Sequence, residues 1–194
     1  MQMKIETNAS KIYGCTKCNL HKTRRRIVIG RGHIPADLLI IGEGPGNAED
    51  ATGEAFMGPA GNLLDRMLLD AECFGSEELQ TPSFFMTNTV LCHPTDSVAG
   101  DNRKPKAAEI HACMKNVLYI YELVQPKMTI LCGETAQKFY AGEVPDPLMM
   151  YHPSFIERTG SIGSPYYSRC LRVLNTAYKK VLYAQGIRKK GSTV

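Results

Sequence analysis

The stretch Gly42–Gly61, GEGPGNAEDATGEAFMGPAG, determines how the rest of this chain is interpreted. The apolar run 36–41 precedes it, and helical apolar spacing follows from Asn62 onward. The stretch therefore lies where a buried strand ends and a helix begins, which is where open α/β sheets bind ligands. Its repeated glycines allow backbone to approach a ligand closely and to adopt positive φ.

The same stretch carries many carboxylates, namely Glu43, Glu49, Asp50 and Glu54. So much negative charge argues against a phosphate cradle, and neither the phosphate-loop pattern nor G-x-G-x-x-G is present. The composition instead favours a neutral, flat ligand and chemistry that develops positive charge.

The bulk composition is that of a soluble globular protein. The 194 residues are 43% apolar and 22% charged, which fits one domain spanning 1–194 with a proper core. No apolar run approaches the ~20 residues needed to cross a bilayer. The start, MQMKIETNASKIYG, shows no signal-peptide core. We expect a cytoplasmic protein that does not bind membranes.

Strand-like and helix-like segments alternate along the chain. The predicted strands are 36–42, 83–91, 127–133 and 148–151, and the predicted helices are about 61–73, 106–124, 134–140 and 166–185. Residues 15–35, 95–105 and 155–165 are predicted loops. This alternation indicates an α/β fold, a three-layer α/β/α sandwich with a central four-stranded parallel sheet.

Three polar side chains stand at the ends of predicted strands: Glu43, Asn88 and His152. Each alone has an ordinary explanation, as a solvated glutamate, a turn-capping asparagine or a histidine bonded to a local carbonyl. Because parallel strands end at one edge of a sheet, however, the three side chains can converge on one pocket.

Basic residues cluster near both ends, in Lys22–Arg26 and in 188–190, although the formal net charge is only +4. Two interpretations stay open at this point. The clusters are either a solvated face with a basic tail or a footprint that contacts nucleic-acid phosphates.

Seven cysteines occur in the chain, and without a secretory signal we do not expect disulfides. The C-x-x-C of Cys15 and Cys18 is better interpreted as half of a metal or cluster site than as a redox motif. The candidates for the other half are Cys73, Cys92, Cys113, Cys132 and Cys170.

Three motifs resemble those of the family 4 (thermostable, iron–sulfur) uracil-DNA glycosylases. The string from Gly42 onward, GEGPGNAEDATGEAFMGPAGNLL, resembles G-E-[AG]-P-G-x-x-E-D-x-x-G-x-P-F-V-G-x-A-G. Residues 87–94, TNTVLCHP, resemble T-N-x-V-K-C-R-P, and His152-Pro153-Ser154 resembles H-P-[SA]. The resemblance runs from about Cys15 to Ser154. It implies the uracil-DNA glycosylase-like fold and an enzyme that excises uracil from DNA, leaving an abasic site.

The resemblance also implies a [4Fe–4S] cluster. The cysteines at the matching places are Cys15, Cys18, Cys92 and Cys113. A Cys₄ zinc site has the same ligand chemistry and stays as the alternative. We expect the cluster to tie the N-terminal loop to the loop after the second strand, and Cys73, Cys132 and Cys170 to be small buried hydrophobes.

The chemistry of uracil excision assigns roles to the motif residues. The nucleotide must be flipped into a pocket that reads its Watson–Crick edge. By resemblance Phe56 stacks on the uracil, while the Asn88 amide matches O4 and N3–H. His152 would hydrogen-bond O2 of the leaving anion. Glu43 would orient the attacking water, assisted by backbone amides near Gly44.

Contacts to DNA are expected from arginines. Arg24, Arg25 and Arg26 are the candidates for phosphate contacts. Arg158, beside Phe155-Ile156, is a further candidate, and that apolar pair is either a wedge that fills the gap left by the flipped base or part of the core. The expected partner is uracil-containing DNA, bound by a monomer associated with the nucleoid.

The chain departs from the family pattern at several positions. Ala55 replaces the usual Pro before the stacking Phe, and Met57 replaces the usual Val. Two alternatives therefore stay open: a glycosylase for another modified pyrimidine, and a non-catalytic DNA-binding accessory module of the same fold.

Overall fold

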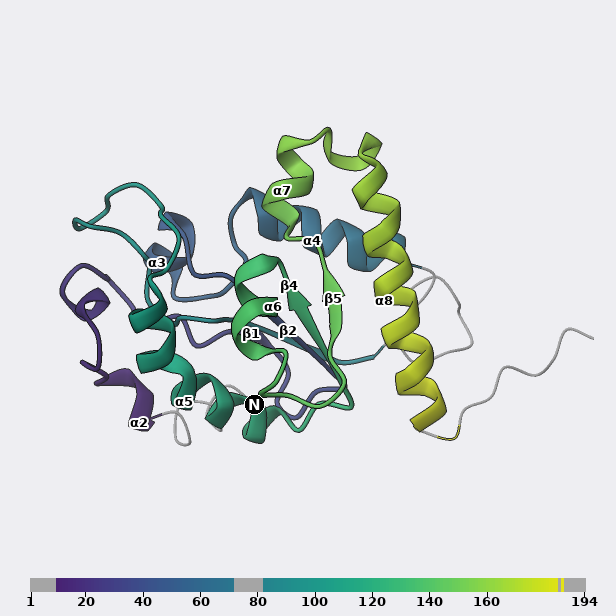
Figure 1. Ribbon diagram of the computed structural model, residues 1–194, viewed down its shortest axis with the longest axis horizontal. Coiled ribbons are helices and arrows are strands. Elements are labelled where there is room, and N and C mark those ends of the chain that lie inside the picture. The colour runs from purple at the N-terminus through teal and green to yellow at the C-terminus, as the bar shows by residue number, and fades with distance from the viewer. Residues whose placement is uncertain (1–9, 72–81, 185, 187–194) are drawn as a thin grey trace, which may run out of the picture.

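The computed structural model describes residues 10–71, 82–184 and 186. A five-stranded sheet with the order β1-β3-β2-β4-β5 forms its centre (Figure 1). The strands are β1 (Arg31–Gly32), β2 (Leu38–Gly42), β3 (Phe84–Asn88), β4 (Met128–Cys132) and β5 (Leu148–Met150). The last four lie within the four predicted strands and run parallel to one another.

The sheet is mixed, so the prediction of a purely parallel four-stranded sheet is wrong at one edge. β1 pairs antiparallel with β3, with Arg31 opposite Met86 and Gly32 opposite Phe85. A strand of 2 residues is too short to show the alternation on which strand prediction depends. β1 is a strand because it pairs with β3, and its own sequence does not identify it as one.

Both faces of the sheet are covered, as the apolar character of β2 predicts. Leu38 and Ile40 belong to one buried cluster, and Leu39 and Ile41 belong to the other. This division follows from the alternation of side chains along a strand. The three-layer α/β/α arrangement is thus confirmed.

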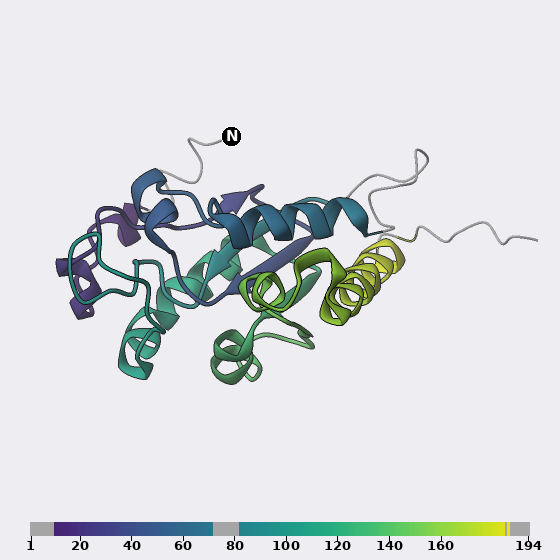
Figure 2. The same cartoon turned by 90° about the horizontal axis from the view of Figure 1, so that it is seen from above.

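The helices form the two outer layers. They are α2 (Ser10–Tyr13), α3 (Asn47–Thr52), α4 (Pro59–Asp70), α5 (Ala107–Val124), α6 (Glu134–Tyr140), α7 (Pro153–Arg158) and α8 (Pro165–Ala184), with short 3₁₀ turns η1 (Asn19–Lys22) and η3 (Ser161–Gly163). Core residues of α4, α7 and α8 share one cluster, and those of α2, α5 and α6 share the other. Figure 2 shows α4 on the opposite side of the sheet from α5 and α6.

Two short helices lie where the sequence predicted loops. α3 lies inside the glycine-rich stretch, where Glu49 at the third helical position accepts a hydrogen bond from the Gly46 N–H at 2.9 Å. This is a capping box with glycine as N-cap, a signal that the glycine content obscured. α7 begins at Pro153, directly after His152, and fills part of the predicted 155–165 loop.

None of the helices within the described ranges is both long and apolar enough to cross a membrane.

Candidate active site

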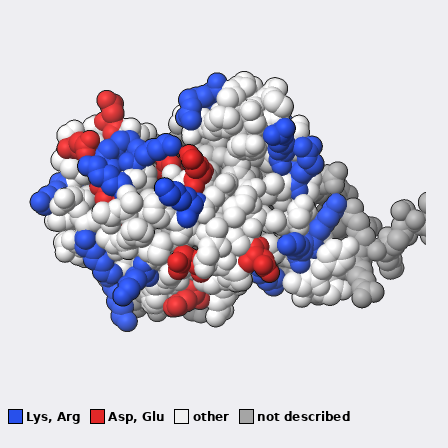
Figure 3. Space-filling view, viewed as in Figure 1, with Lys and Arg blue, Asp and Glu red and all other residues white. Residues whose placement is uncertain are grey.

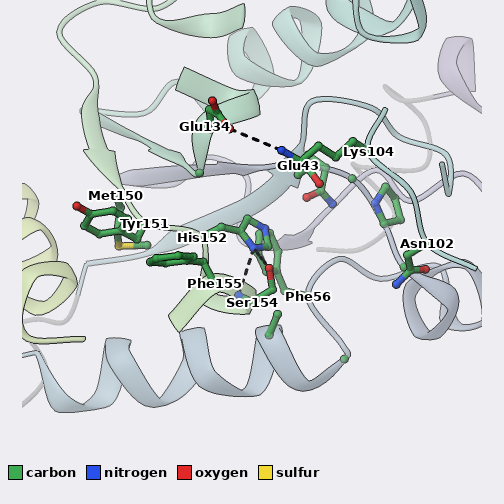
Figure 4. Close-up of a pocket in the computed structure, with 18 of the residues that line it drawn as sticks. Glu43, Phe56, Asn102, Lys104, Glu134, Met150, Tyr151, His152, Ser154 and Phe155 are labelled. Carbon is green, nitrogen blue, oxygen red and sulfur yellow. Dashed lines mark hydrogen bonds and ion pairs between the residues drawn. The ribbon is translucent and has the colours of Figure 1, made fainter. Parts of the chain in front are cut away.

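A cavity of about 880 Å³ opens at the edge where the parallel strands end (Figure 4). β2 and β4 are neighbours although β3 lies between them in the chain, and such a switch in strand order creates a binding crevice. All five predicted catalytic and substrate-binding residues line this cavity: Glu43, Gly44, Phe56, Asn88 and His152. Segments distant in sequence therefore meet around one space.

Phe56 lies against the end of β2. A Cβ added to Gly42 would stand 2.6 Å from Phe56 Cζ and 2.7 Å from Asn88 Oδ1, so only glycine leaves room for these two side chains. Phe56 itself has φ of 57°, a left-handed conformation that is unusual for a bulky residue. Strained backbone of this kind concentrates at functional sites.

Asn88 is 3% exposed, yet no residue in the described part of the chain hydrogen-bonds its side-chain amide. β-sheet register places Asn88 opposite Gly42, at the end of both strands. The amide therefore offers one donor group and one acceptor to a ligand in the cavity.

His152 is positioned by the start of α7. Its Nδ1 accepts a hydrogen bond from the Ser154 backbone N–H at 3.3 Å and lies 2.8 Å from Ser154 Oγ. Since Nδ1 is an acceptor, the proton of the neutral ring resides on Nε2. Burial lowers the pKa of His152, nearby Arg158 acts in the same direction, and Glu43 opposes them. The ring is therefore a neutral Nε2–H donor at pH 7.

We expect this tautomer to be visible by NMR. The long-range ¹H–¹⁵N spectrum should show His152 protonated on Nε2 alone at pH 7, with a titration midpoint below the usual ~6.5. Folding disfavours the cation, so the ring becomes charged only as the pH falls below that usual value. The His152→Gln variant assigns the signal. A protonated Nδ1, or a midpoint above ~6.5, would contradict this arrangement.

Glu43 is held by two threonines that the sequence interpretation missed. Thr135, in the first turn of α6, donates to Glu43 Oε2, and Thr89 donates to the Glu43 carbonyl. No described residue hydrogen-bonds Oε1, so that oxygen remains available to a ligand or water. Thr135 comes three residues after the end of β4, at the same sheet edge as the predicted residues, and this position is the signal that could have identified it.

Two buried carboxylates organise the glycine-rich stretch. Glu49 Oε1 accepts from the backbone N–H groups of Met57 and Gly58, each at 2.8 Å, in addition to the bond from Gly46. Asp50, 0% exposed, accepts from the backbone of Arg25 and Arg26. Of the four carboxylates that argued against a phosphate cradle, Glu49 thus holds the loop together from within, and Asp50 ties it to the segment that contains Arg25 and Arg26.

The predicted DNA-contacting arginines do not lie in one place. Arg158 lines the cavity, whereas Arg24, Arg25 and Arg26 do not. Arg24 is half-buried and donates to Cys92 Sγ at 3.3 Å, and Arg26 donates to the Thr52 carbonyl at 3.3 Å. On the face shown in Figure 3, basic side chains also lie along α8.

The structure separates Phe155 from Ile156, because Phe155 is half-buried and lines the cavity whereas Ile156 belongs to the core. Ile156 is 0% exposed, so it does not form a wedge in this conformation. Phe155 packs on Tyr151 with ring centroids 5.7 Å apart. Of the two interpretations of this pair, the core one fits Ile156.

Four cysteines line a second, small cavity between the N-terminal segment and α5: Cys15, Cys18, Cys92 and Cys113. None forms a disulfide. Asn116 donates to Cys15 Sγ at 3.4 Å, as Arg24 does to Cys92. Burial raises the pKa of Cys92 to about 11 and that of Cys113 to about 12. Thiols held in this way need a strongly positive centre to become thiolates, and this donor set fits a metal group.

Among the described residues, no group of three or more His, Cys, Asp or Glu side chains is arranged to hold a metal ion. A tetrahedral zinc site with Zn–S bonds of about 2.3 Å would bring its sulfurs to within about 4 Å of one another. Of the remaining cysteines, Cys132 and Cys170 are buried, as expected for small hydrophobes. Cys73 lies outside the described residues.

Comparison with known proteins agrees with this geometry. Residues 29–175 match the family model of the uracil DNA glycosylase superfamily. The type-4 uracil-DNA glycosylase of Thermotoga maritima is 32% identical over 136 residues, 70% of this chain and 65% of that protein. The type-4 uracil-DNA glycosylase of Archaeoglobus fulgidus is 34% identical over 129 residues, 66% of this chain and 59% of that protein.

The matches thus span about three fifths of the length of these relatives, and they confirm the resemblance to the family 4 enzymes. The matched range contains every element of the sheet and the residues that line the cavity from Glu43 to His152. The chain belongs to the uracil DNA glycosylase superfamily.

Proposed function

We propose that this protein is a monofunctional uracil-DNA glycosylase, which hydrolyses the N-glycosidic bond of uracil in DNA and leaves an abasic site for base excision repair. The observation that carries the proposal is the meeting of Phe56, Asn88, His152 and Glu43 around one cavity. A ring face, an amide, a neutral imidazole and a carboxylate are the groups that this reaction needs.

Recognition of the base rests on Phe56 and Asn88. The flipped uracil stacks on the Phe56 ring, and the unpartnered Asn88 amide donates to O4 and accepts from N3–H. Cytosine presents the opposite donor and acceptor pattern at these atoms. It would leave buried polar groups unpaired, which is a large source of discrimination.

Catalysis rests on His152 and Glu43. The His152 Nε2–H donates to uracil O2, where negative charge accumulates as the glycosidic bond breaks. Glu43, oriented by Thr135 through Oε2, accepts a hydrogen bond from the attacking water through Oε1. Its charge also favours the oxocarbenium-like sugar, and the backbone at Gly44 assists. Water adds to the sugar carbon C1′ as the bond from C1′ to uracil N1 breaks. The added water loses one proton to solvent, and the uracil leaves as an anion that then takes up one proton.

DNA phosphates are bound by Arg158 at the cavity and by exposed groups of the Arg24–Arg26 cluster. Within that cluster, Arg24 also donates a hydrogen bond to Cys92.

All catalytic groups come from one chain, so a monomer is sufficient. As an enzyme that acts on DNA, it belongs with the nucleoid in the cytoplasm.

Cys15, Cys18, Cys92 and Cys113 hold a [4Fe–4S] cluster in this proposal. They line one cavity, and four thiolates are the ligand set that such a cluster takes. When bound, the cluster supplies a structural link rather than a reactive centre. The four cysteines connect the N-terminal segment to the loop after β3 and to α5, away from the cavity at the sheet edge.

Two observations argue against the other candidate functions. Met57 is not among the residues that line the cavity, and Ala55 is 0% exposed, so neither departure from the family pattern reshapes the pocket wall directly. The complete set of catalytic groups has no use in a non-catalytic binding module.

A single assay tests the proposal. Purified protein is incubated with oligonucleotides that carry uracil, thymine or another modified pyrimidine, and abasic sites are then cleaved with alkali. We expect cleavage at uracil, and Asn88→Ala should reduce it by at least ~100-fold because the pocket loses its base-reading amide. Asn62→Ala, an exposed asparagine on α4, is the matched control and should keep full activity. Cleavage at another pyrimidine but not at uracil would reject uracil as the substrate. No cleavage at any of these bases would reject the proposal that the protein is a glycosylase.

A further inference from the structure

The cavity is larger than the proposed reaction needs. Its volume of about 880 Å³ falls in the range that holds whole drug-sized ligands, whereas uracil is a single flat ring. Beyond His152 the lining continues over residues without a role in base excision, which include Met149, Tyr151, Phe155, Arg169 and Val173.

Three aromatic side chains beside this part of the cavity form one group, which we call the aromatic platform: Tyr151, Phe155 and Tyr166. Tyr151 and Phe155 are near-parallel, with centroids 5.7 Å apart and an interplanar angle of 24°. Tyr166 packs edgewise on both, at 4.8 Å from Tyr151 and 4.9 Å from Phe155. Each ring therefore holds the other two in place.

The platform is accessible through Tyr151, whereas Phe155 and Tyr166 are half-buried. Tyr151 is 39% exposed and the neighbouring Met149 is 44% exposed. In Figure 4 the Tyr151 and Phe155 rings lie side by side, adjacent to His152. A rigid, exposed ring next to a substrate-binding histidine is suited to stacking.

Two arginines lie beside the platform, while the carboxylates Glu43, Glu49 and Glu134 line other parts of the cavity. The charged residues that α7 and α8 contribute to the cavity lining are Arg158 and Arg169, both cations. The Arg169 guanidinium lies 5.5 Å from the Tyr166 centroid, and its Nη1 donates to Tyr151 Oη at 3.4 Å. Aromatic rings interleaved with arginines are typical of surfaces that bind single-stranded nucleic acid.

We propose that the aromatic platform, through Tyr151, binds an unpaired base next to the flipped uracil, while Arg158 and Arg169 contact the phosphates of that stretch. This inference rests on the proposed function. Tyr151 directly precedes His152 in the chain. A DNA strand that delivers uracil to His152 therefore passes beside the Tyr151 ring. A base that is paired within a duplex cannot turn onto the ring, so the platform serves single-stranded substrates.

A substrate–protein double-mutant cycle tests this inference. Uracil release is measured on single-stranded oligonucleotides in which a base-free spacer replaces one flanking base at a time, on each side of the uracil. At one position the spacer should raise the KM of the wild-type protein by about tenfold, which is the order expected for one stacked base. Tyr151→Ala should raise KM similarly on the ordinary substrate, and both changes together should cost no more than either alone.

Controls separate this inference from the proposed function. Tyr151→Phe keeps the ring and should keep the spacer effect, and Tyr183→Ala, an exposed tyrosine at the far end of α8, should behave as wild type. On a duplex Tyr151→Ala should change KM little. Additive effects at every position, or an equal loss on duplex and single strand, would overturn the inference while uracil release stands. Absence of uracil release by the wild-type protein would instead overturn the proposed function.

Discussion

His152→Ala should slow uracil release under single-turnover conditions by about 10²- to 10³-fold, which is the cost of removing one donor aimed at a developing oxyanion. The Nε2–H of the neutral ring is that donor, because Nδ1 is engaged by Ser154. The effect should fall on the chemical step rather than on DNA binding, since charge builds up on O2 only as the bond breaks.

Two variants show whether the hydrogen bond itself is responsible. His152→Gln retains an amide donor on a side chain of similar reach and should recover part of the lost rate. His33→Ala removes an exposed histidine outside the cavity lining and should leave the rate unchanged. If His152→Ala released uracil as fast as wild type, stabilisation of the leaving anion by this residue would be ruled out.

The sequence predicted which polar groups meet at the sheet edge, because each of them stands at the end of an apolar run that is typical of a buried strand. Glu43, Asn88 and His152 needed only a parallel sheet in order to meet, and the structure places all three at one cavity. The convergence of these three side chains could therefore be predicted without knowing the conformation of the loops.

The residues that the sequence did not reveal act through contacts between loops. Thr135 reaches Glu43 across 92 positions, and Asp50 binds the backbone of Arg25 across 25 positions. No periodicity links such pairs. The edge strand β1 was missed for the same reason, because its identity depends on Phe85 and Met86 of β3.

The arginines illustrate a different limit. A run of basic residues predicts a positive surface, but not which side chains are free to form it. Arg24 bonds a cysteine sulfur, whereas Arg158, isolated in the sequence, lies at the cavity. The density of basic residues along the chain therefore identified arginines that lie away from the cavity, and it did not identify Arg158.

Cys113→Ser should abolish the bound cluster and lower the stability of the N-terminal segment. Cys113 lies on α5, while Cys15 and Cys18 lie in a segment with little regular structure. In the proposed function a shared metal group joins them, and metal-binding free energy in such sites is folding free energy. Loss of one ligand should therefore bleach the brown absorbance near ~400 nm that iron–sulfur proteins show, and it should expose residues around Cys15 to proteolysis.

The matched control is Cys132→Ala, which removes a fully buried cysteine of β4 that lies outside the four-cysteine cavity. It should keep the colour and a full complement of iron and sulfide, even if its melting temperature falls through loss of packing. Iron, sulfide and zinc are measured on each purified variant. One zinc per wild-type chain without iron would establish the alternative metal, whereas iron retained in Cys113→Ser would show that this cysteine is not a ligand. Either result would leave the cavity at the sheet edge unaffected, because none of the residues that line it also lines the four-cysteine cavity.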